Sequence, residues 1–298
     1  MITVIGSIGY DLTTISERLP NPGETLVGTG FVSAPGGKGA NQALAAKRAG
    51  SDTQMIGAVG NDAFAPQALE LLDKGGVDLS RVKTSPTATG IALIFVGGTG
   101  ENMIVIAQGA NATVMPEDIA ALAINKGDYV LLQMEIPTQT VAAAVKMARE
   151  KGAISILNTA PFHLDAVALM ADADITVANE TEFDLAADAM ALHGVDRKTK
   201  MSAFVAKTGK TIIVTLGADG VLAVTPLGNF SASALKITPV DTVGAGDTFC
   251  GYLGASLAQG LGLEAAMARA AAAGSLACTK AGAQPAIPLL ADVLKAMA

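Results

Sequence analysis

Hydrophobic residues recur along this chain in short runs that alternate with helix-like stretches, and this alternation predicts most of the secondary structure. Residues 1–6 are apolar and β-branched and end in glycine, which predicts a buried first strand. Residues 36–50 predict a helix, because basic residues and a glycine stand at its end. Residues 53–59 predict a second strand and residues 65–74 a second helix. The first part of the chain therefore contains strands and helices in alternation.

Two stretches interrupt this pattern, and neither has a helix to cover it. Residues 11–35 contain Pro20, Pro22 and several glycines between short alternating segments, which predicts hairpin or loop structure. Residues 90–96 and 102–107 are β-rich and are joined by Gly-Gly-Thr-Gly, which predicts a hairpin. Together these stretches predict a small sheet separate from the main one.

From residue 129 the alternation becomes regular. Predicted strands cover residues 129–133, 154–157, 175–178, 211–215, 221–224 and 234–238, and predicted helices cover residues 138–151, 166–170, 180–191 and 265–277. Strands that alternate with helices favour right-handed βαβ units and a mostly parallel sheet covered on both faces. We therefore predict an α/β fold in a single domain, residues 1–298. Ligands of such sheets bind beyond the carboxyl ends of the strands.

Composition narrows the function classes. The 298 residues are 50% hydrophobic and 16% charged, which allows a large core, and the formal net charge of -7 argues against nonspecific binding to nucleic acid or anionic membranes. The first residues lack the basic segment of a signal peptide, and no apolar run reaches the roughly 18 residues of a membrane span. Cys250 and Cys278 lie in apolar helical contexts and are expected to be reduced. These features predict a soluble cytoplasmic protein.

Polar residues stand where several predicted strands end: Asp11, Glu135, the pair Asn179 and Glu182, and the turn at residues 217–220. Taken singly, each has a simpler explanation, since Asp11 and the turn suit tight loops and the pair suits a helix capping box. Because the carboxyl ends of parallel strands share one edge, their joint occurrence predicts a ligand site there.

Residues 240–249, Val-Asp-Thr-Val-Gly-Ala-Gly-Asp-Thr-Phe, join a predicted strand (235–240) to an apolar helix. Gly244 and Gly246 let the backbone turn sharply, and the first N–H groups of a helix have no intrahelical partner, so this corner favours an anion such as phosphate. Asp247 stands where that anion would bind. Its carboxylate is either the N-terminal cap of the helix or a base that takes a proton from a hydroxyl.

Two long motifs resemble the signatures of a known family. Residues 36–43, Gly-Gly-Lys-Gly-Ala-Asn-Gln-Ala, and residues 241–249 are similar to those of the ribokinase/phosphofructokinase-B family of sugar kinases, and within it to the ribokinases. Shorter matches in the family's order are residues 22–25, 133–135, 179–182, 215–217 and 282–285. The resemblance runs nearly end to end. It implies a ribokinase-like fold with a mostly parallel central sheet and a small β-sheet lid.

The resemblance implies transfer of a phosphoryl group from ATP to the primary 5-hydroxyl of D-ribose. It makes Asp247 the catalytic base, and the N–H groups of Gly244, Ala245 and Gly246 the anion hole. The positions that match the family's sugar site are Asp11, Gly37, Asn41, Glu135 and Asp247. Those that match its ATP site are Asn179, Thr215, Gly217, Gly220 and Gly246.

The resemblance also implies two metal ions. Glu182 matches a position that holds Mg²⁺ through water, and a monovalent cation, usually K⁺ in this family, is implied beside the anion hole. The positions that match the ligands of this second ion are Asp241, Val243, Ala277, Lys280 and Gly282. The β-rich stretches, about residues 11–35 and 88–107, match a lid that closes over the sugar and joins two subunits into a homodimer.

Two departures from the family pattern concern the substrate and the cation. Ribokinases have asparagine and alanine where this chain has Gly9 and Tyr10, so one sugar-binding side chain is missing and bulk is added beside it. Another pentose, a deoxy sugar, a fructose-type sugar or a nucleoside therefore stays open as the substrate. Ala286 stands where ribokinases usually have serine, which predicts weaker activation by the monovalent cation.

Two other functions stay open. A non-catalytic protein that binds sugar or nucleotide on the same fold would have no use for Asp247 as a base. A dehydrogenase is less well supported, because no Gly-x-Gly-x-x-Gly motif follows the first strand. Residues 208–211 end like a phosphate-binding loop without its first glycine, and His163 and His193 are too isolated for a metal site.

Overall fold

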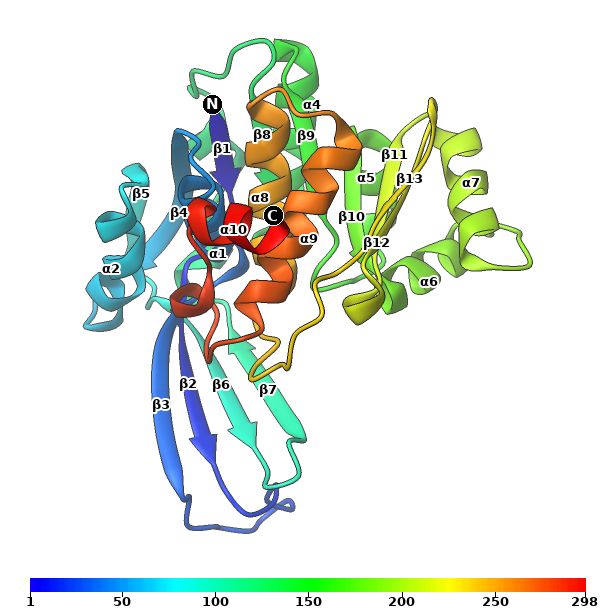
Figure 1. Ribbon diagram of the computed structural model, residues 1–298. Coiled ribbons are helices and arrows are strands. Elements are labelled where there is room, and N and C mark those ends of the chain that lie inside the picture. The colour runs from blue at the N-terminus through cyan, green and yellow to red at the C-terminus, as the bar shows by residue number, and fades with distance from the viewer.

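The central sheet of the computed structural model, which describes residues 1–298, has nine strands in the order β13-β12-β11-β10-β9-β8-β1-β4-β5 (Figure 1). These strands are β1 (Ile2–Ile5), β4 (Thr53–Gly60), β5 (Asp78–Ser85), β8 (Tyr129–Leu132), β9 (Ile154–Asn158), β10 (Ile175–Asn179), β11 (Thr211–Thr215), β12 (Val221–Thr225) and β13 (Gly228–Ala232). All neighbours from β5 to β11 run parallel, and β12 and β13 continue antiparallel at one edge. The predicted mostly parallel sheet is confirmed.

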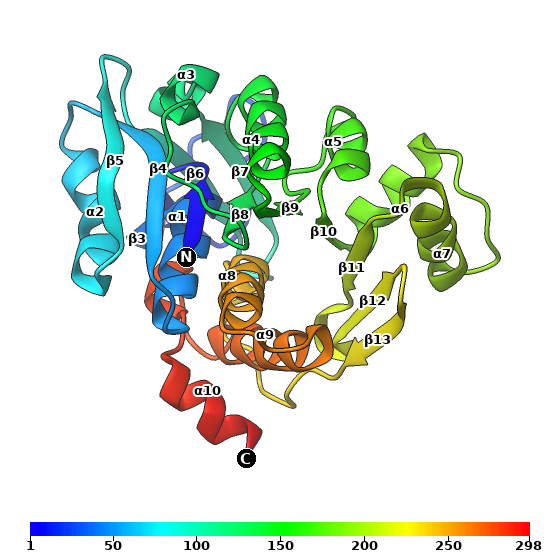
Figure 2. The same cartoon turned by 90° about the horizontal axis from the view of Figure 1, so that it is seen from above.

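Helices cover both faces of this sheet (Figure 2). One face carries α1 (Lys38–Arg48), α2 (Phe64–Gly75), α8 (Ala245–Ala258) and α9 (Leu263–Ala277), and the other carries α3 (Pro116–Ile119), α4 (Thr138–Lys151), α5 (Ala166–Asp172), α6 (Glu180–Ala189) and α7 (Arg197–Thr208). The last helix, α10 (Leu290–Met297), packs on α9. None of the helices is long and apolar enough to cross a membrane.

Each face of the sheet buries its own apolar cluster. The two clusters contain 35 and 33 buried residues, so the sheet is covered about equally on both sides. Successive side chains of a strand point to opposite faces, which is why Val4 belongs to one cluster and its neighbour Ile5 to the other. Polar residues at the strand ends are thereby left at the rim of a rigid core.

A second sheet of four strands extends away from the main body (Figure 1). Its order is β3-β2-β6-β7, with β2 (Gly9–Ile15), β3 (Gly30–Gly36), β6 (Gly90–Val96) and β7 (Asn102–Ala107). β2 follows the carboxyl end of β1 after residues 6–8, and α1 begins directly after β3. This sheet is therefore anchored at the carboxyl edge of the central sheet, and the predicted small second sheet is confirmed. Three short 3₁₀ turns, η1 (Gly109–Thr113), η2 (Gly217–Asp219) and η3 (Gln284–Ala286), complete the fold.

The strand predicted at residues 234–238, and extended to residue 240 before the corner, is wrong. β13, at residues 228–232, forms a tight hairpin with β12 and occupies the sheet edge instead. The backbone N–H of Leu235 donates to Ser275 Oγ of α9 at 3.1 Å. The segment after β13 therefore runs along α9 as an irregular strip and forms the wall of a cavity.

Sequence reasoning missed β5, α7 and α10. Each buries only one or two of its residues, so the apolar pattern along it is weak; in α7 only Met201 and Phe204 are buried. A local signal was present for α7, because Asp196 caps it by accepting from the backbone N–H of Thr199 at 2.7 Å.

Candidate active site

Three cavities form a row at the carboxyl edge of the central sheet. The first, of about 480 Å³, lies between η2 and the helices α8 and α9, and the second, of about 220 Å³, contains Asp247. These two share Thr215, Thr242 and Gly246 in their linings. The third, of about 270 Å³, lies against the second sheet and contains Glu135. This arrangement suits one ligand in each outer cavity and a reacting group between them.

Asp247 lies at the centre of this row. It is the third residue of α8, and Gly244, with φ of 77°, is the N-cap, so Asp247 does not cap the helix. Its Oδ2 accepts from Asn41 Nδ2 at 2.9 Å, and its Oδ1 accepts from Gln42 Nε2 at 3.1 Å. The side chain is 5% exposed. The structure therefore removes the capping explanation and leaves a buried carboxylate that faces the second cavity.

The N-terminus of α8 offers free backbone donors beside that carboxylate. Ala245 N bonds weakly to Thr242 O at 3.3 Å, and the next backbone bond runs from Thr248 N to Gly244 O. The N–H groups of Gly246 and Asp247 have no backbone partner. Because these groups lie at the positive end of the helix dipole, they can bind an oxyanion in the second cavity.

Acidic side chains line the third cavity. Glu135 Oε2 accepts from Ser7 Oγ at 2.5 Å and from the backbone N–H of Lys38 at 3.0 Å, which fixes this carboxylate. The carboxylate of Asp11 accepts no hydrogen bond from another protein group. Burial, then the charges of Glu135 and Asp247, raise the pKa of Asp11 to about 6, and Lys38 partly offsets them. Asp11 is therefore an unsatisfied acceptor that suits a ligand rich in hydroxyl groups.

The two glycines that join β3 to α1 cannot be replaced without moving this cavity. A side chain at Gly36 would meet Asp11 Oδ1 at 2.4 Å. Gly37 has φ of 88°, and a side chain there would meet Gly9 N and Ser7 O within 3 Å. The close approach of these backbone segments is what brings Asp11 next to the start of α1.

Tyr10 does not lie where the sequence analysis expected it. Gly9 and Asp11 line the third cavity, but Tyr10 points to the other side of β2, because successive residues of a strand face opposite ways. Its hydroxyl lies 3.2 Å from Ser33 Oγ, and its ring packs on Phe64 with centroids 5.7 Å apart. The prediction that Tyr10 adds bulk beside the sugar site is therefore wrong. Gly9 does line the cavity, and it contributes no side chain there.

Asn179 and Glu182 form the capping box considered for them, and both also face a cavity. Asn179 Oδ1 accepts from Glu182 N at 2.8 Å and Glu182 Oε2 accepts from Asn179 N at 3.0 Å, so the pair forms a capping box on α6. Thr159 Oγ1 also donates to Glu182 Oε2, at 2.9 Å. Glu182 Oε1 accepts no hydrogen bond, and both residues line the second cavity. The cap thus orients a carboxylate whose second oxygen is free to hold a hydrated cation.

Lys38 was missed as a site residue, although it stands within the first long motif. Its side chain lines the second cavity together with Asp247 and Glu182. The negative charge of Asp247, with those of Glu135 and Glu182, raises the pKa of Lys38 against the opposing effect of burial. A partly buried ammonium group whose pKa is raised is suited to a phosphate ligand.

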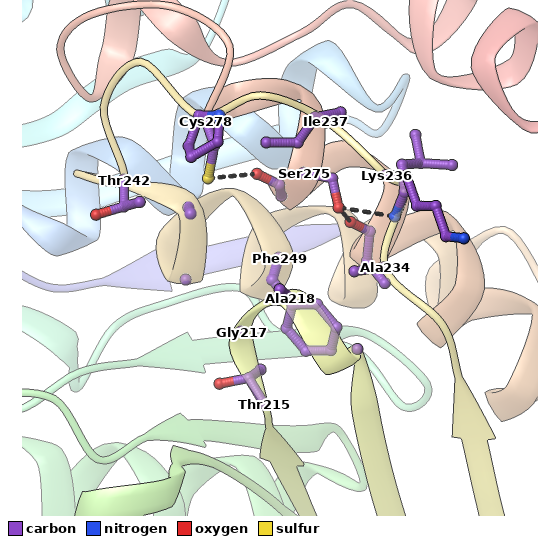
Figure 3. A pocket seen from close by; sticks show the side chains of 17 residues that line it. Thr215, Gly217, Ala218, Ala234, Lys236, Ile237, Thr242, Phe249, Ser275 and Cys278 are labelled. Carbon is purple, nitrogen blue, oxygen red and sulfur yellow. Dashed lines mark hydrogen bonds between the residues drawn. The ribbon is translucent and has the colours of Figure 1, made fainter.

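The first cavity is mostly apolar (Figure 3). Four residues matched to the family's ATP site line it: Thr215, Gly217, Gly220 and Gly246. The lining also includes residues that the sequence did not point to: Ala218, residues 234–237, Pro239, Phe249, Ser275 and Cys278. Ser275 Oγ donates to Ala271 O at 2.8 Å, and Cys278 Sγ to Gly274 O at 3.4 Å, so both are already paired. A flat, apolar group such as a nucleotide base suits this lining.

The residues matched to a monovalent-cation site come together beside the corner. Asp241 Oδ1 accepts from Val243 N at 3.0 Å and Oδ2 accepts from Gly282 N at 2.8 Å. Ala277 O accepts only a weak bond, of 3.4 Å, from Lys280 N. The set offers carboxylate and carbonyl oxygens, which fit a hard cation, and Asp241 also holds the two loops together without one. Ala286 is buried on η3.

The chain is similar to carbohydrate kinases over nearly its whole length. The family model for pfkB family carbohydrate kinases matches residues 1–290. A ribokinase of Lactococcus lactis is 37% identical over 295 residues, which cover 98% of this chain and 95% of that protein. A deoxyribokinase of Salmonella typhi is 36% identical over 293 residues, which cover 96% and 95%. A solved Arabidopsis thaliana ribokinase complexed with ribose and ATP has a TM-score of 0.86 at 30% identity and covers 99% and 98%.

Proposed function

The chain belongs to the pfkB family of carbohydrate kinases and is a phosphotransferase with an alcohol group as acceptor, and we propose that it transfers the γ-phosphoryl group of ATP to the 5-hydroxyl of D-ribose. The observation that carries this proposal is the position of Asp247. Its buried carboxylate lines the second cavity and accepts a hydrogen bond from Asn41, a residue matched to the sugar site. One carboxylate therefore lies between the sites assigned to the two substrates.

In the proposed reaction Asp247 accepts the proton of the sugar hydroxyl as its oxygen attacks the γ-phosphorus, and the bond from that phosphorus to the bridging oxygen of ADP breaks. The N–H groups of Gly246 and Asp247 bind the charge that develops on the transferred group. Lys38 adds a fixed positive charge on the same side. Holding both substrates in one row turns a bimolecular collision into a reaction within a complex.

We assign the first cavity to the adenine base and the strip of Thr215, Gly217 and Gly220 to the rest of the nucleotide. Glu182, with its free Oε1, and Asn179 would hold the Mg²⁺ of the ATP complex through water. That ion would neutralise charge on the phosphate oxygens. K⁺ is the proposed monovalent cation, held by Asp241 and by carbonyl groups of the 277–282 loop, and its effect is expected to be weaker than in relatives with serine in place of Ala286.

The second sheet is proposed to act as a lid on one domain that comprises residues 1–298, with about residues 11–35 and 88–107 as the inserted segments. Asp11 pairs with Ala92, and Ala92 with Ile106, so these residues share one face of the sheet, and all three line the third cavity. Val32 and Ile104 continue that face and are about half exposed. An apolar exposed face next to a sugar site suits cover by a second subunit, and we propose a homodimer through the lid.

A second candidate acceptor is a deoxy sugar. Gly9 lines the third cavity and offers no side-chain partner to a hydroxyl, and Asn111 is held on both sides by the backbone of Ile8 at 2.9 Å. Loss of one sugar hydroxyl would therefore sacrifice less binding here than in a site with a full set of partners. The 36% identity to a deoxyribokinase supports testing this acceptor.

The testing experiment measures ATP consumption with ribose, 2-deoxyribose, other pentoses, fructose-type sugars and nucleosides, in K⁺ and in a bulky organic cation. We expect the highest kcat/KM with ribose and a faster rate in K⁺. Asp247→Asn should lower kcat by about 10²- to 10⁴-fold, the usual contribution of a general base. Lack of stimulation by any sugar would contradict the kinase assignment for these substrates. Full activity of Asp247→Asn would contradict the base assignment alone.

A further inference from the structure

Gln42 is a buried glutamine in contact with Asp247 that neither the base, the anion hole nor the substrate sites account for. It lies on α1 next to Asn41 and is 1% exposed. Its Nε2 donates to Asp247 Oδ1 at 3.1 Å, with a longer approach of 3.5 Å to Asn158 Oδ1. Its Oε1 accepts from Gln133 Nε2 at 2.7 Å. Every polar atom of this side chain is thus paired inside the core.

The neighbours of Gln42 determine which end of its amide faces Asp247. An amide can turn by half a rotation and exchange its oxygen and nitrogen. Gln133, at the end of β8, gives a hydrogen to Gln42 Oε1, and Asn158 presents its own oxygen because its Nδ2 donates to Val177 O at 3.3 Å. Asn158 Oδ1 and the carboxylate of Asp247 both accept hydrogen bonds, so they require the NH₂ end of Gln42 to point at them, and Gln133 pairs with the other end.

Gln133 is itself confined. It is fully buried, and its Oε1 has no hydrogen-bond partner. A side chain at Gly6 would meet this Oε1 at 2.0 Å, so the glycine after β1 leaves the space that the glutamine occupies. Gly6, Gln133 and Asn158 therefore lie at the ends of β1, β8 and β9, and together they fix a chain of hydrogen bonds that leads through Gln42 to Asp247.

Asp247 receives one amide on each oxygen. Asn41 reaches Oδ2 and Gln42 reaches Oδ1, from consecutive residues of α1. Lys38 is the nearby positive charge, and no hydrogen bond joins it to Asp247. Without Gln42 only Asn41 would hold the carboxylate, and Oδ1 could turn toward that ammonium group and away from the sugar hydroxyl.

We propose that Gln42, oriented by Gln133 and Asn158, is a positioning residue that keeps the carboxylate of Asp247 aimed at the acceptor hydroxyl. The proposal rests on the assignment of Asp247 as the base. Gln42 touches neither substrate in this account; it acts on the rate through Asp247. Gln133 acts one step further away, by preventing the amide of Gln42 from turning over.

The main test is Gln42→Met, which keeps the length of the side chain and removes its donor. We expect kcat to fall by about 10²-fold, the scale of a small misalignment of a reacting group, with KM for ATP and for the sugar within about threefold of wild type. Gln133→Met, which does not touch Asp247, should lower kcat by a smaller factor. In the Asp247→Asn background, Gln42→Met should cause no further loss.

Ser155→Ala is the matched control. Ser155 is 1% exposed at the start of β9, and its hydroxyl pairs with Asp174 at the opposite edge of the sheet. This change should lower Tm and leave kcat unchanged. It therefore separates the loss of a buried hydrogen bond from the loss of the orientation of the Asp247 carboxylate. Wild-type kcat in Gln42→Met, a change confined to KM, or an equal loss in the Asp247→Asn background would each overturn the proposal. An active Asp247→Asn enzyme would overturn the base assignment instead.

Discussion

At the scale of single residues, the site brings together negatively charged side chains that repel one another. Asp11, Glu135 and Asp247 bring three carboxylates to neighbouring cavities, and Lys38 is the cation among them. Asn41 and Gln42 satisfy Asp247, and Ser7 satisfies Glu135, but no protein group satisfies Asp11. Asp11 is therefore the carboxylate of this group that is left to accept hydrogen bonds from a ligand in the third cavity.

Asp11→Asn should remove this repulsion and therefore stabilise the folded protein. The folded-state pKa of about 6 lies above the ordinary value of 3.8, so Asp11 favours folding only at low pH, and that contribution is lost as pH rises from about 4 through 6. The variant should be more stable than wild type by about 1–2 kcal/mol at pH 7 and by almost nothing at pH 4. Thermal unfolding at both pH values measures this. Equal shifts at both would contradict it.

The same residue predicts a pH dependence of sugar binding. An ionised carboxylate accepts hydrogen bonds from two or more hydroxyls, and the protonated form loses part of that capacity. KM for the sugar should therefore rise as pH falls below about 6, while KM for ATP changes less. Initial rates at several sugar concentrations between pH 5 and pH 8 (roughly the range that contains this pKa) test the point. In Asp11→Asn the rise in the KM for the sugar should disappear.

At the scale of elements, the start of α8 shows two glycines with different reasons for being there. Gly244 has φ of 77°, and a side chain would meet Ala283 at 2.8 Å, whereas a side chain at Gly246 would meet nothing within 4 Å of it. The first glycine is needed by the backbone and by packing. The second is needed only by whatever occupies the cavities that it lines.

This pair gives a matched test. Gly246→Ala should keep or slightly raise Tm, because alanine is the better helix former, and should raise KM for ATP by about tenfold, because its methyl group projects into the phosphate cavity. Gly244→Ala should lower stability by about 1–2 kcal/mol or more from its left-handed conformation alone. Thermal scans with ATP kinetics separate the two. Unchanged KM in Gly246→Ala would show that ATP does not use this cavity.

Elements with a strong apolar period were predicted well, and polar ones were not. The strands at 90–96, 102–107 and 211–215 and the helix at 138–151 have the predicted bounds. The strand predicted at 234–238 failed because a tight hairpin places 228–232 on the same sheet edge first. No local pattern distinguishes residues 228–232 from residues 234–238. What decides between them is which of the two pairs with the free edge of β12.

At the scale of the whole molecule, the second sheet is the element that is best suited to contact a second copy of the chain. Its face with Asp11, Ala92 and Ile106 continues through Val32 and Ile104, and it projects from the body of the protein (Figure 1). Two copies of the chain could cover these faces at once, because a two-fold interface uses the same patch on both subunits.

Ile104→Lys tests this arrangement. Ile104 is 51% exposed, and a charge in the centre of a buried interface is costly to desolvate, so sedimentation should show a dimer for wild type and a monomer for the variant. KM for the sugar should rise in the variant, since the third cavity would lose its cover. Val195→Lys, at a position that is 99% exposed on the main body, is the control and should remain dimeric. A monomeric wild type would contradict the proposal.

By itself the sequence determined the class of the fold, the order of its main elements and the two motifs that contain Asp247 and Asn41, because periodicity and glycine positions act locally. Only the tertiary structure decided which groups meet. It turned Tyr10 away from the third cavity through the pleat of β2, and it brought Gln133, which follows β8, onto Gln42 of α1. It also assembled the first cavity from η2, an irregular strip and α9. Such contacts join residues far apart in the chain, and they depend on how the two sheets and the helices pack together.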